Sequence, residues 1–568
     1  MPRLVIAAPT SGSGKTTVAT GLIAALVAKG RRVAPFKVGP DYIDPGYHAL
    51  AGGRPGRNLD PVLVGEAMIG PLFAHGVTGT EIAVIEGVMG LFDGRSTPTA
   101  VSRPAAATAA FDPIATSTAG AWSSAAGSAA ASSAEAPSTA FGSIAFGSTA
   151  HVARLLDAPV VLVVDSRGQG RSLAALLHGF RSYDPTVRLA GVVLNQVGSA
   201  RHEQVLWEAC AEIGLLVLGA VPRGADVALP SRHLGLIPAA EHGEPARRAV
   251  AAMGELITRS VDLDAICQLA ATAGPAPWVA WDAATEVARV REPREIGGAS
   301  GLSPREIGGV SGLGTTAAAG AEVGGRGVVP ASGDAAGLGA AGASDAEGFG
   351  GVGGQRLSGA AGGRPPVVAV AGGAAFTFGY AEYVELLAAA GASVAVVDPL
   401  RDELLPHGTA ALVLPGGFPE RHTTSLSANE KLRYLVSEFA RSGGILQAEC
   451  GGLLYLLTEL SGEPMCGVLP GAATMNTRLT LGYRDAVVAT DSIAHRVGER
   501  RTGHEFHHTH MSNTDSPAAS AWYWRDHDGR PVREGFVLGN VHASYLHTHP
   551  AGQPETVVRL VDAAGGRS

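Results

Sequence analysis

A glycine-rich run between an apolar strand and a helix constrains the fold of this chain more than any other feature. Residues 8–17 read Ala-Pro-Thr-Ser-Gly-Ser-Gly-Lys-Thr-Thr, after the apolar segment 4–8 and before a helical pattern that begins near Val18. In such a loop, backbone N–H groups and the helix N-terminus bind phosphate oxygens, a lysine reaches the outer phosphates, and a threonine ligates magnesium. The run therefore predicts a nucleotide-phosphate site. Pro9 stands where the usual pattern has its first glycine, which disfavours a simple GTPase or motor ATPase.

Length and composition narrow the class of protein. A chain of 568 residues exceeds what one hydrophobic core usually organises, so we expect two or more domains. The net charge is −8 and no run of basic residues is present, which argues against nucleic-acid and membrane partners. The chain opens directly as a strand and every apolar run is too short to span a bilayer, so we expect a cytoplasmic protein. Neither a disulfide framework nor structural zinc is indicated, because the four cysteines are far apart: Cys210, Cys267, Cys450 and Cys466.

Short apolar strands alternate with longer helical patterns over residues 1–260. The predicted strands are residues 4–8, 82–86, 159–165 and 189–194. This alternation predicts a parallel sheet covered by helices. Between about residues 97 and 146 Ala, Ser and Thr dominate without periodicity, which predicts a disordered insertion in this first domain.

A second low-complexity stretch separates two halves of the chain. Residues 285–363 are rich in Gly and Ala and contain a near repeat that starts at Pro293 and again at Pro304, which we interpret as a flexible linker. Residues 364–560 then form a second α/β domain, with strands expected at 367–371, 392–397, 411–414 and 444–447.

Acidic residues follow the predicted strands of the first domain. Asp41 and Asp44 come soon after a short basic strand that contains Lys37, Glu86 ends the strand 82–86, and Asp93 follows it. Carboxylates at the ends of parallel strands are placed to hold Mg²⁺ against phosphates. Any one of them could be a capping or turn residue. Together with the glycine-rich loop they predict a phosphoryl-transfer site.

Cys450 lies between an apolar strand and a helix, in the sequence Ala-Glu-Cys-Gly-Gly at 448–452. A strand, a sharp turn and a helix in this order raise a nucleophile out of an α/β sheet. The alternative is a small buried thiol at a strand end. The two glycines that follow favour catalysis, because a packing cysteine needs no tight turn.

Two further features suit a cysteine nucleophile. The late segment 540–549 contains several histidines, of which we choose His547 as the general base, the alternative being a solvated histidine. Gly417, in a glycine turn after the strand 411–414, and Gly451 are the candidates for an oxyanion hole. The cluster Gly-His-Glu-Phe-His-His at 503–508 could suggest a metal, but no matching ligand set accompanies it.

Taken together, these motifs make the chain resemble the cobyrinic or hydrogenobyrinic acid a,c-diamide synthases of cobalamin biosynthesis. The C-terminal half resembles a class I glutamine amidotransferase domain, and the N-terminal half resembles the dethiobiotin-synthetase-like P-loop fold. The run Gly-Pro-Asp-Tyr-Ile-Asp-Pro at 39–45 is the most specific motif. The others lie at residues 8–17, 58–60, 86–93, 194–198, 448–452, 479–483 and 503–507.

The resemblance implies an ATP- and Mg²⁺-dependent amidation of the a and c carboxylates of a corrinoid acid, with L-glutamine as nitrogen donor. It assigns ATP to Gly12, Gly14, Lys15, Thr16 and Thr17, with Asn195 similar in placement to a base-recognition asparagine. It assigns the metal to Thr16, Asp41 and Glu86, and the substrate and acyl-phosphate site to Lys37, Asp44 and Asp93. The oligomeric state stays open, with a homodimer as one option.

The chain departs from the usual amidotransferase triad at one position. Such enzymes carry His-x-Glu, in which the glutamate orients the imidazole, whereas this chain has His547-Thr548-His549. The sequence therefore identifies no orienting carboxylate, and a cysteine–histidine pair is expected. Two relatives with the same architecture remain alternatives, cobyric acid synthase and nickel-sirohydrochlorin a,c-diamide synthase. A partitioning-type ATPase switch is disfavoured, because the loop lacks an early second lysine.

Overall fold

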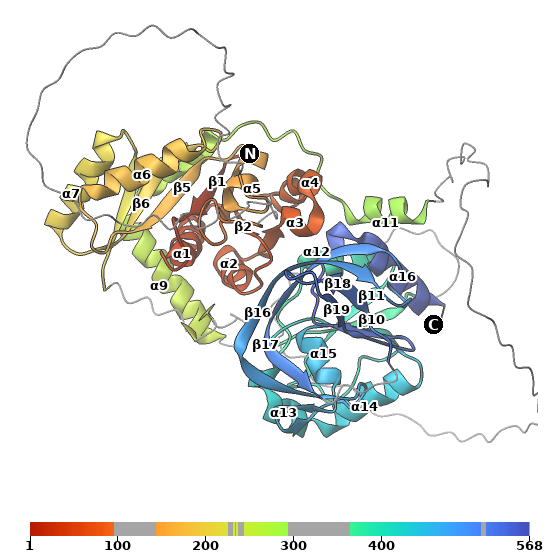
Figure 1. The fold of residues 1–568 in the computed structure, drawn as a ribbon. Helices are drawn as coiled ribbons and strands as arrows, with labels where there is room; N and C mark the ends of the chain where they lie inside the picture. Colours follow the sequence, from red (N-terminus) through yellow and green to blue (C-terminus); the bar gives the residue numbers. More distant parts are fainter. Residues whose placement is uncertain are drawn as a thin grey trace, which may run out of the picture. The chain divides into compact units, whose positions relative to one another are not determined.

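A seven-stranded parallel sheet forms the centre of the N-terminal domain in the computed structural model (Figure 1). Its order is β3-β2-β4-β1-β5-β6-β7, and every pairing is parallel. Apolar residues fill the strands because both faces are covered. The strands are β1 (Arg3–Ala7), β2 (Val33–Val38), β3 (Arg57–Leu59), β4 (Ile82–Glu86), β5 (Val160–Asp165), β6 (Leu189–Val197) and β7 (Val217–Pro222).

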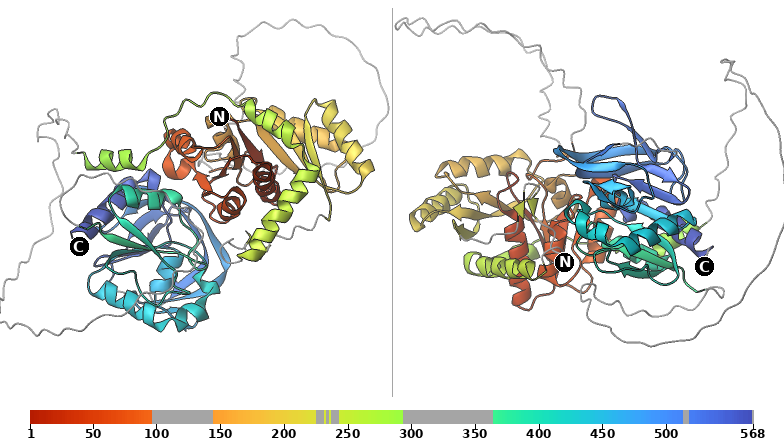
Figure 2. Two further views of the ribbon diagram at one scale, coloured as in Figure 1. Left: turned by 180° about the vertical axis from the view of Figure 1, so that it is seen from behind. Right: turned by 90° about the horizontal axis from the view of Figure 1, so that it is seen from below.

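Helices cover both faces of this sheet (Figures 1 and 2). One face packs against α1 (Lys15–Ala28), α2 (Asp44–Gly52), α9 (Glu244–Ser260) and α10 (Leu263–Ala271). The other packs against α4 (Glu66–Gly76), α5 (Thr149–Leu155), α6 (Ser172–Tyr183) and α7 (Ala200–Glu212). The short helix α3 (Pro61–Val64) begins at Asp60, whose carboxylate accepts hydrogen bonds from two of its backbone N–H groups.

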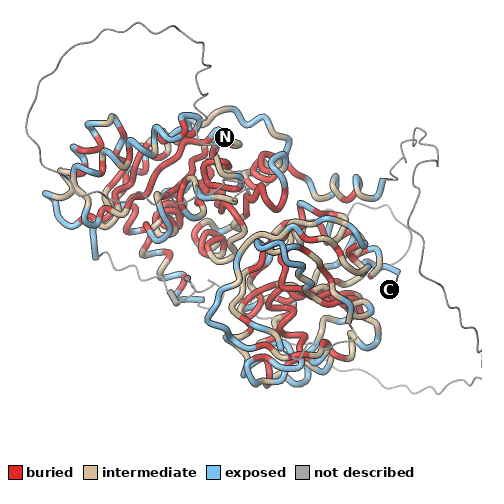
Figure 3. Tube along the Cα trace, in the orientation of Figure 1, coloured by how far each residue is buried: buried red, intermediate tan, exposed pale blue. Residues whose placement is uncertain are grey.

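The C-terminal domain contains a second, mostly parallel sheet. Its order is β11-β10-β12-β13-β21-β20, in which the last pairing is antiparallel. The strands are β10 (Val367–Ala371), β11 (Ser393–Val397), β12 (Thr409–Leu414), β13 (Ile445–Glu449), β20 (Phe536–Leu538) and β21 (Val541–Ser544). One face packs against α12 (Ala381–Ala389) and α16 (Pro554–Gly565), and the other against α14 (Glu430–Arg441) and α15 (Gly451–Leu456). Figure 3 shows the strands of both parallel sheets as largely buried.

An additional, largely antiparallel sheet joins this domain. It is built around β16 (Ala472–Val488) and β17 (Arg500–Ser512), which form a long antiparallel pair. Its other strands are β14 (Glu459–Leu460), β15 (Glu463–Pro464), β18 (Trp522–Arg525) and β19 (Pro531–Glu534). Many side chains of β16 are exposed, so this strand lacks the apolar pattern of the parallel strands.

The structure describes residues 1–95, 144–224, 231–232, 235–236, 243–292, 364–512 and 518–566. Most of the expected insertion and linker lies outside these ranges. The first residues of the expected linker are helical, because α11 runs from Ala283 to Arg291. Residues 1–290 and 362–568 belong to one compact unit. None of the helices in the described ranges is long and apolar enough to cross a membrane.

Candidate functional site

The glycine-rich loop connects β1 to α1 and is fixed from two sides. Gly14 is the N-cap of α1 with a φ of +95°, a conformation that glycine adopts without strain. A Cβ there would lie 2.3 Å from the side-chain nitrogen of Asn195, which donates to the Ser13 carbonyl at 2.9 Å. On the other side, Lys15 Nζ donates to the Met89 carbonyl at 2.7 Å. Burial lowers the pKa of Lys15. The loop is therefore held in shape by β6 and by the segment that follows β4.

Next to this loop, Lys37 lies among the predicted carboxylates at the carboxyl ends of β2 and β4. Its Nζ donates to Asp44 Oδ2 at 2.5 Å and to Glu86 Oε1 at 3.0 Å, and Asp41 Oδ2 lies 4.0 Å away. Thr16 Oγ1 donates to the same Glu86 oxygen at 2.6 Å. The structure thus brings together five of the residues predicted for the metal and the substrate.

A histidine that sequence reasoning did not assign to the site completes this cluster. His48 Nε2 donates to Glu86 Oε2 at 2.7 Å, and both side chains are fully buried. Burial alone would raise the pKa of Glu86, but the Lys37 ammonium and the His48 hydrogen bond hold it well below the usual glutamate range. Glu86 is therefore an ionised, oriented carboxylate. The available signal was helical spacing, since His48 follows Asp44 by one turn of α2.

The segment after β4 folds back over the phosphate loop. Leu91 N–H donates to the Ala8 carbonyl at 2.8 Å, and Asp93 Oδ2 accepts from Gly90 N–H at 2.9 Å. A Cβ at Gly90 would lie 2.5 Å from the Pro9 carbonyl oxygen, so only glycine fits this approach. Asp93 consequently lies beside the loop as expected, and its carboxylate favours the charged form of Lys15.

Cys450 occupies a sharp turn between β13 and α15 in the C-terminal domain. Its φ is +47°, a strained value for a residue with a side chain. Cys450 N–H donates to the Ser544 carbonyl at 2.7 Å, which ties the turn to β21. The thiol is buried, and burial raises its pKa, with the Glu420 carboxylate adding to the effect. Such a thiol becomes nucleophilic only when a base takes its proton.

Two backbone amides converge beside this thiol. Gly451 N–H hydrogen-bonds to the Cys450 sulfur and thereby favours the thiolate. A Cβ on Gly451 would lie 2.8 Å from the Gly417 nitrogen, and one on Gly417 would lie 2.1 Å from the Ala375 carbonyl oxygen. Both positions therefore require glycine. Because the two amides lie close together, the geometry suits the predicted oxyanion hole.

His547 is buried and packs against the same glycine turn. A Cβ on Gly416 would lie 2.3 Å from ring atom Cε1 of His547, so the imidazole packs directly on this backbone. The backbone of His547 exchanges two hydrogen bonds with His504, each 2.9 Å long. The ring lies 5.1 Å from that of Tyr42, measured between centroids. Gly416, which precedes Gly417, thus connects the predicted base to the turn that faces Cys450.

Comparison with known proteins gives a family for both halves. The model of the CobQ/CobB/MinD/ParA nucleotide binding domain matches residues 4–237, and that of the CobB/CobQ-like glutamine amidotransferase domain matches residues 367–554. Hydrogenobyrinate a,c-diamide synthases of Mycobacterium tuberculosis and Streptomyces coelicolor are each 48% identical to the chain, over 98% and 99% of it and 97% of their own lengths. Cobyrinate a,c-diamide synthase of Gloeobacter violaceus is 35% identical over 98% of the chain and 96% of its own length.

The chain belongs to the a,c-diamide synthase family. This membership confirms the family predicted from the motifs, and the two domain matches confirm the predicted fold class. It also agrees with an amidating ligase that binds a nucleotide in one domain and glutamine in the other.

The side chains of the predicted histidine cluster in β17 are in contact with neighbouring residues. His504 packs against Tyr483, and His507 stacks on Tyr545 with ring centroids 3.7 Å apart. Glu505 is paired with Arg484 at 2.6 Å. Within the described ranges, the one group with metal-ligand spacing is Asp526, His527 and Asp528, which is largely exposed and contains none of these residues.

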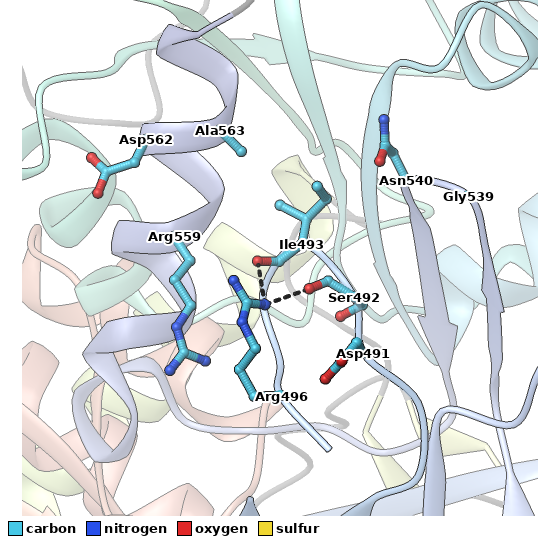
Figure 4. A pocket seen from close by; sticks show the side chains of 9 residues that line it. All are labelled: Asp491, Ser492, Ile493, Arg496, Gly539, Asn540, Arg559, Asp562 and Ala563. Carbon is cyan, nitrogen blue, oxygen red and sulfur yellow. Dashed lines mark hydrogen bonds between the residues drawn. The ribbon is translucent and has the colours of Figure 1, made fainter.

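A surface pocket in the amidotransferase domain contains none of the predicted residues (Figure 4). Its arginines are already engaged: Arg496 donates to the backbone carbonyls of Ser492 and Ile493, and Arg559 pairs with Glu499 at 2.7 Å. The pocket therefore offers no free cation for an acidic substrate.

Proposed function

We propose that this family member is an ATP-dependent, glutamine-hydrolysing ligase that amidates the a and c side-chain carboxylates of hydrogenobyrinic acid. The observation that carries the proposal is full-length similarity to hydrogenobyrinate a,c-diamide synthases, combined with the buried cysteine turn and the Lys37 cluster in one chain. Two relatives named for hydrogenobyrinate are 48% and 41% identical to the chain, against 35% and 31% for two named for cobyrinate. This difference favours the cobalt-free substrate.

Ammonia is made at the Cys450 turn. His547 takes the thiol proton while the sulfur attacks the glutamine side-chain amide, and the amides of Gly417 and Gly451 bind the oxyanion that forms. The protonated His547 then gives its proton to the leaving ammonia. Water hydrolyses the resulting thioester and releases glutamate.

Activation of the corrinoid carboxylate takes place at the phosphate loop. The backbone of Gly12 and Gly14, the hydroxyl of Thr17 and the ammonium of Lys15 bind the ATP phosphates, and a substrate carboxylate oxygen attacks the terminal phosphorus. Lys37, which pairs with Asp44 and Glu86, neutralises charge near the transferred group, and Asp93 lines the same site beside the loop. Ammonia then attacks the acyl phosphate and phosphate leaves. Asn195 stays our candidate for base recognition, although its amide is also bonded to the loop backbone.

The oxygen donors next to Lys37 fit magnesium. Thr16, Asp41 and Glu86 present a hydroxyl and two carboxylates, the ligand types that Mg²⁺ prefers. When bound there, the ion would supply charge neutralisation for the ATP phosphates.

Substrate and product masses test this function. Purified protein is incubated with ATP, Mg²⁺, glutamine and either hydrogenobyrinic or cobyrinic acid. We expect two amide additions to hydrogenobyrinic acid, with one glutamate released for each. Absence of amidation on both acids contradicts the proposed function, and preference for cobyrinic acid contradicts the cobalt-free substrate.

Replacement of the nucleophile separates the two half-reactions. We expect Cys450→Ser to lower glutamine-dependent synthesis by at least about 10³-fold, because the weak serine nucleophile forms no thioester. Synthesis with ammonium chloride should remain within about threefold of wild type. Cys267→Ser, in α10, is the matched control and should retain both activities. Equal loss with ammonia in Cys450→Ser would contradict the two-site mechanism.

A further inference from the structure

We propose that Glu449, the residue before the nucleophile, is the carboxylate that positions His547 and stabilises its protonated form. The proposal deepens the glutaminase half of the proposed function and rests on it. Glu449 takes the role of the glutamate that the usual triad carries two residues after the histidine, a position that His549 occupies in this chain.

The parallel sheet brings the two residues together. Glu449 is the last residue of β13, and it is in register with Ser544, the last residue of the neighbouring parallel strand β21. The chain continues from Ser544 to His547 within three residues. Side chains that leave the same ends of adjacent parallel strands meet at one edge of the sheet.

The contacts of Glu449 leave one carboxylate oxygen facing the imidazole. Glu449 Oε2 lies 3.6 Å from His547 Nδ1, within ion-pair distance. Its other oxygen, Oε1, accepts a hydrogen bond from Thr548 Oγ1 at 3.1 Å, which fixes the carboxylate plane. A separation of 3.6 Å exceeds a formed hydrogen bond, and such contacts often tighten when substrate binds.

His549, which stands at the usual position of the glutamate, makes contacts elsewhere. His549 Nδ1 accepts a hydrogen bond from Ala551 N–H at 3.2 Å, and its ring packs on Tyr380 at 4.1 Å between centroids. Burial lowers the pKa of His549 to about 4, so it is neutral at neutral pH and cannot stabilise an imidazolium. Within the described residues, neither ring nitrogen of His547 has a hydrogen-bond partner.

Two further titratable groups that lie close to His547, Tyr42 and His504, are neutral. Burial raises the pKa of Tyr42 well above its usual value and lowers that of His504 to about 3. Glu449 therefore offers a negative charge within ion-pair distance of a protonated His547.

The chemistry assigns a separate task to each ring nitrogen. A carboxylate at Nδ1 holds the proton on that nitrogen, which leaves Nε2 as the base for the Cys450 thiol. The thiol proton moves to Nε2 as the C–S bond forms, and it later moves to the departing ammonia. Glu449 takes part in neither proton transfer. Its charge also stabilises the imidazolium. This favours transfer of the thiol proton to His547 and offsets the effect of burial, which raises the pKa of the Cys450 thiol.

Neutralising Glu449 tests the proposal. We expect Glu449→Gln to lower the kcat for glutamate release by at least about 10²-fold, because the uncharged amide neither orients His547 nor stabilises its protonated form. The KM for glutamine should change less than about threefold, because glutamine binding stays intact. Alkylation of Cys450 by iodoacetamide at pH 7 should slow by at least about tenfold, because fewer thiolate–imidazolium pairs form. Ammonia-dependent synthesis should stay unchanged.

Two further variants separate positioning from other effects. Glu403→Gln is the control, because it neutralises an exposed carboxylate of the same domain that pairs with Lys431. It should leave kcat within about threefold of wild type. Thr548→Val keeps the carboxylate but removes the hydrogen bond that fixes it, and it should lower kcat by about threefold to tenfold.

Three results would overturn the proposal. They are glutaminase and alkylation rates of Glu449→Gln close to wild type, equal losses in Glu449→Gln and Glu403→Gln, or a loss of ammonia-dependent synthesis as large as that of glutaminase. The last result would assign Glu449 to the fold. Failure of the proposed function itself is distinct, since wild-type protein would then release no glutamate.

Discussion

At the residue scale, Lys37 is the cation on which the synthetase cluster depends. Burial would lower its pKa, but Asp44 and Glu86 raise it well above the usual lysine value. Removing the charge takes the ammonium partner from two buried carboxylates, and breaking such a buried ion pair typically costs about 3–5 kcal/mol. We expect Lys37→Met to lower the Tm by several degrees, and Lys37→Met combined with Glu86→Gln to recover at least half of the loss, as measured by thermal unfolding. Additive losses in the double variant would contradict this coupling.

Individual site residues could be predicted where a motif fixes them and were missed where the fold supplies them. Lys15 and Thr16 follow from one contiguous loop, and Cys450 follows from the glycines beside it. Glu449 was not predicted as a site residue, although it is adjacent to Cys450, because its contact with His547 depends on the pairing of β13 with β21. Strand pairing between distant segments leaves no spacing that a single sequence reveals.

At the scale of elements, the close crossing of α1 and α9 holds the phosphate loop against the sheet. A Cβ on Gly21 of α1 would lie 2.6 Å from the Met253 carbonyl oxygen and 2.6 Å from Ile257 Cγ1. We expect Gly21→Ala to cost about 1–3 kcal/mol through overpacking, despite the better helix propensity of alanine. Gly179→Ala, in α6, is the matched control: its Cβ meets nothing within 4 Å, so the Tm should rise slightly. A higher Tm for Gly21→Ala would contradict the tight crossing.

The predicted elements match the structure best where strands are buried on both faces. The predicted strands 4–8, 82–86 and 159–165 correspond within a residue or so to β1, β4 and β5. The antiparallel sheet around β16 and β17 was not predicted. Its two long strands, β16 and β17, have many exposed or half-buried positions, so hydrophobic periodicity gives no signal there.

At the scale of the whole molecule, the N-terminal and amidotransferase domains share contacts within one compact unit. Tyr483 of β16 donates to Asp60 Oδ2 at 2.9 Å, and Tyr42 of the Gly-Pro-Asp-Tyr motif stacks on Phe378 with centroids 5.0 Å apart. Burial raises the pKa of Asp60 to about 6. The motifs at 39–45, 58–60 and 479–483 could be recognised from the sequence by resemblance. That their residues form contacts between the domains follows only from the structure.

The most strongly charged of these contacts joins β3 to α12 and gives a pH-dependent prediction. Arg57 pairs with Glu382 at 2.6 Å and with Glu385, which also accepts from His75 at 3.0 Å. Burial would raise the pKa of Glu385, but His75 and Arg57 lower it to about 2 from its usual 4.5. Because the folded pKa is the lower one, Glu385 stabilises the fold fully above about pH 4.5, and this contribution is lost as the pH falls towards 2.

Thermal unfolding of Glu385→Gln across pH tests this contribution. We expect the wild-type protein to have the higher Tm at pH 7, by a margin that stays constant down to about pH 5 and then decreases steadily towards pH 3. Glu403→Gln removes an exposed partner of Lys431 and should leave the Tm unchanged at every pH, because exposed pairs contribute little. A margin that is equally large at pH 7 and pH 3 would assign the effect to packing of the side chain, since only a titrating carboxylate loses its contribution in acid.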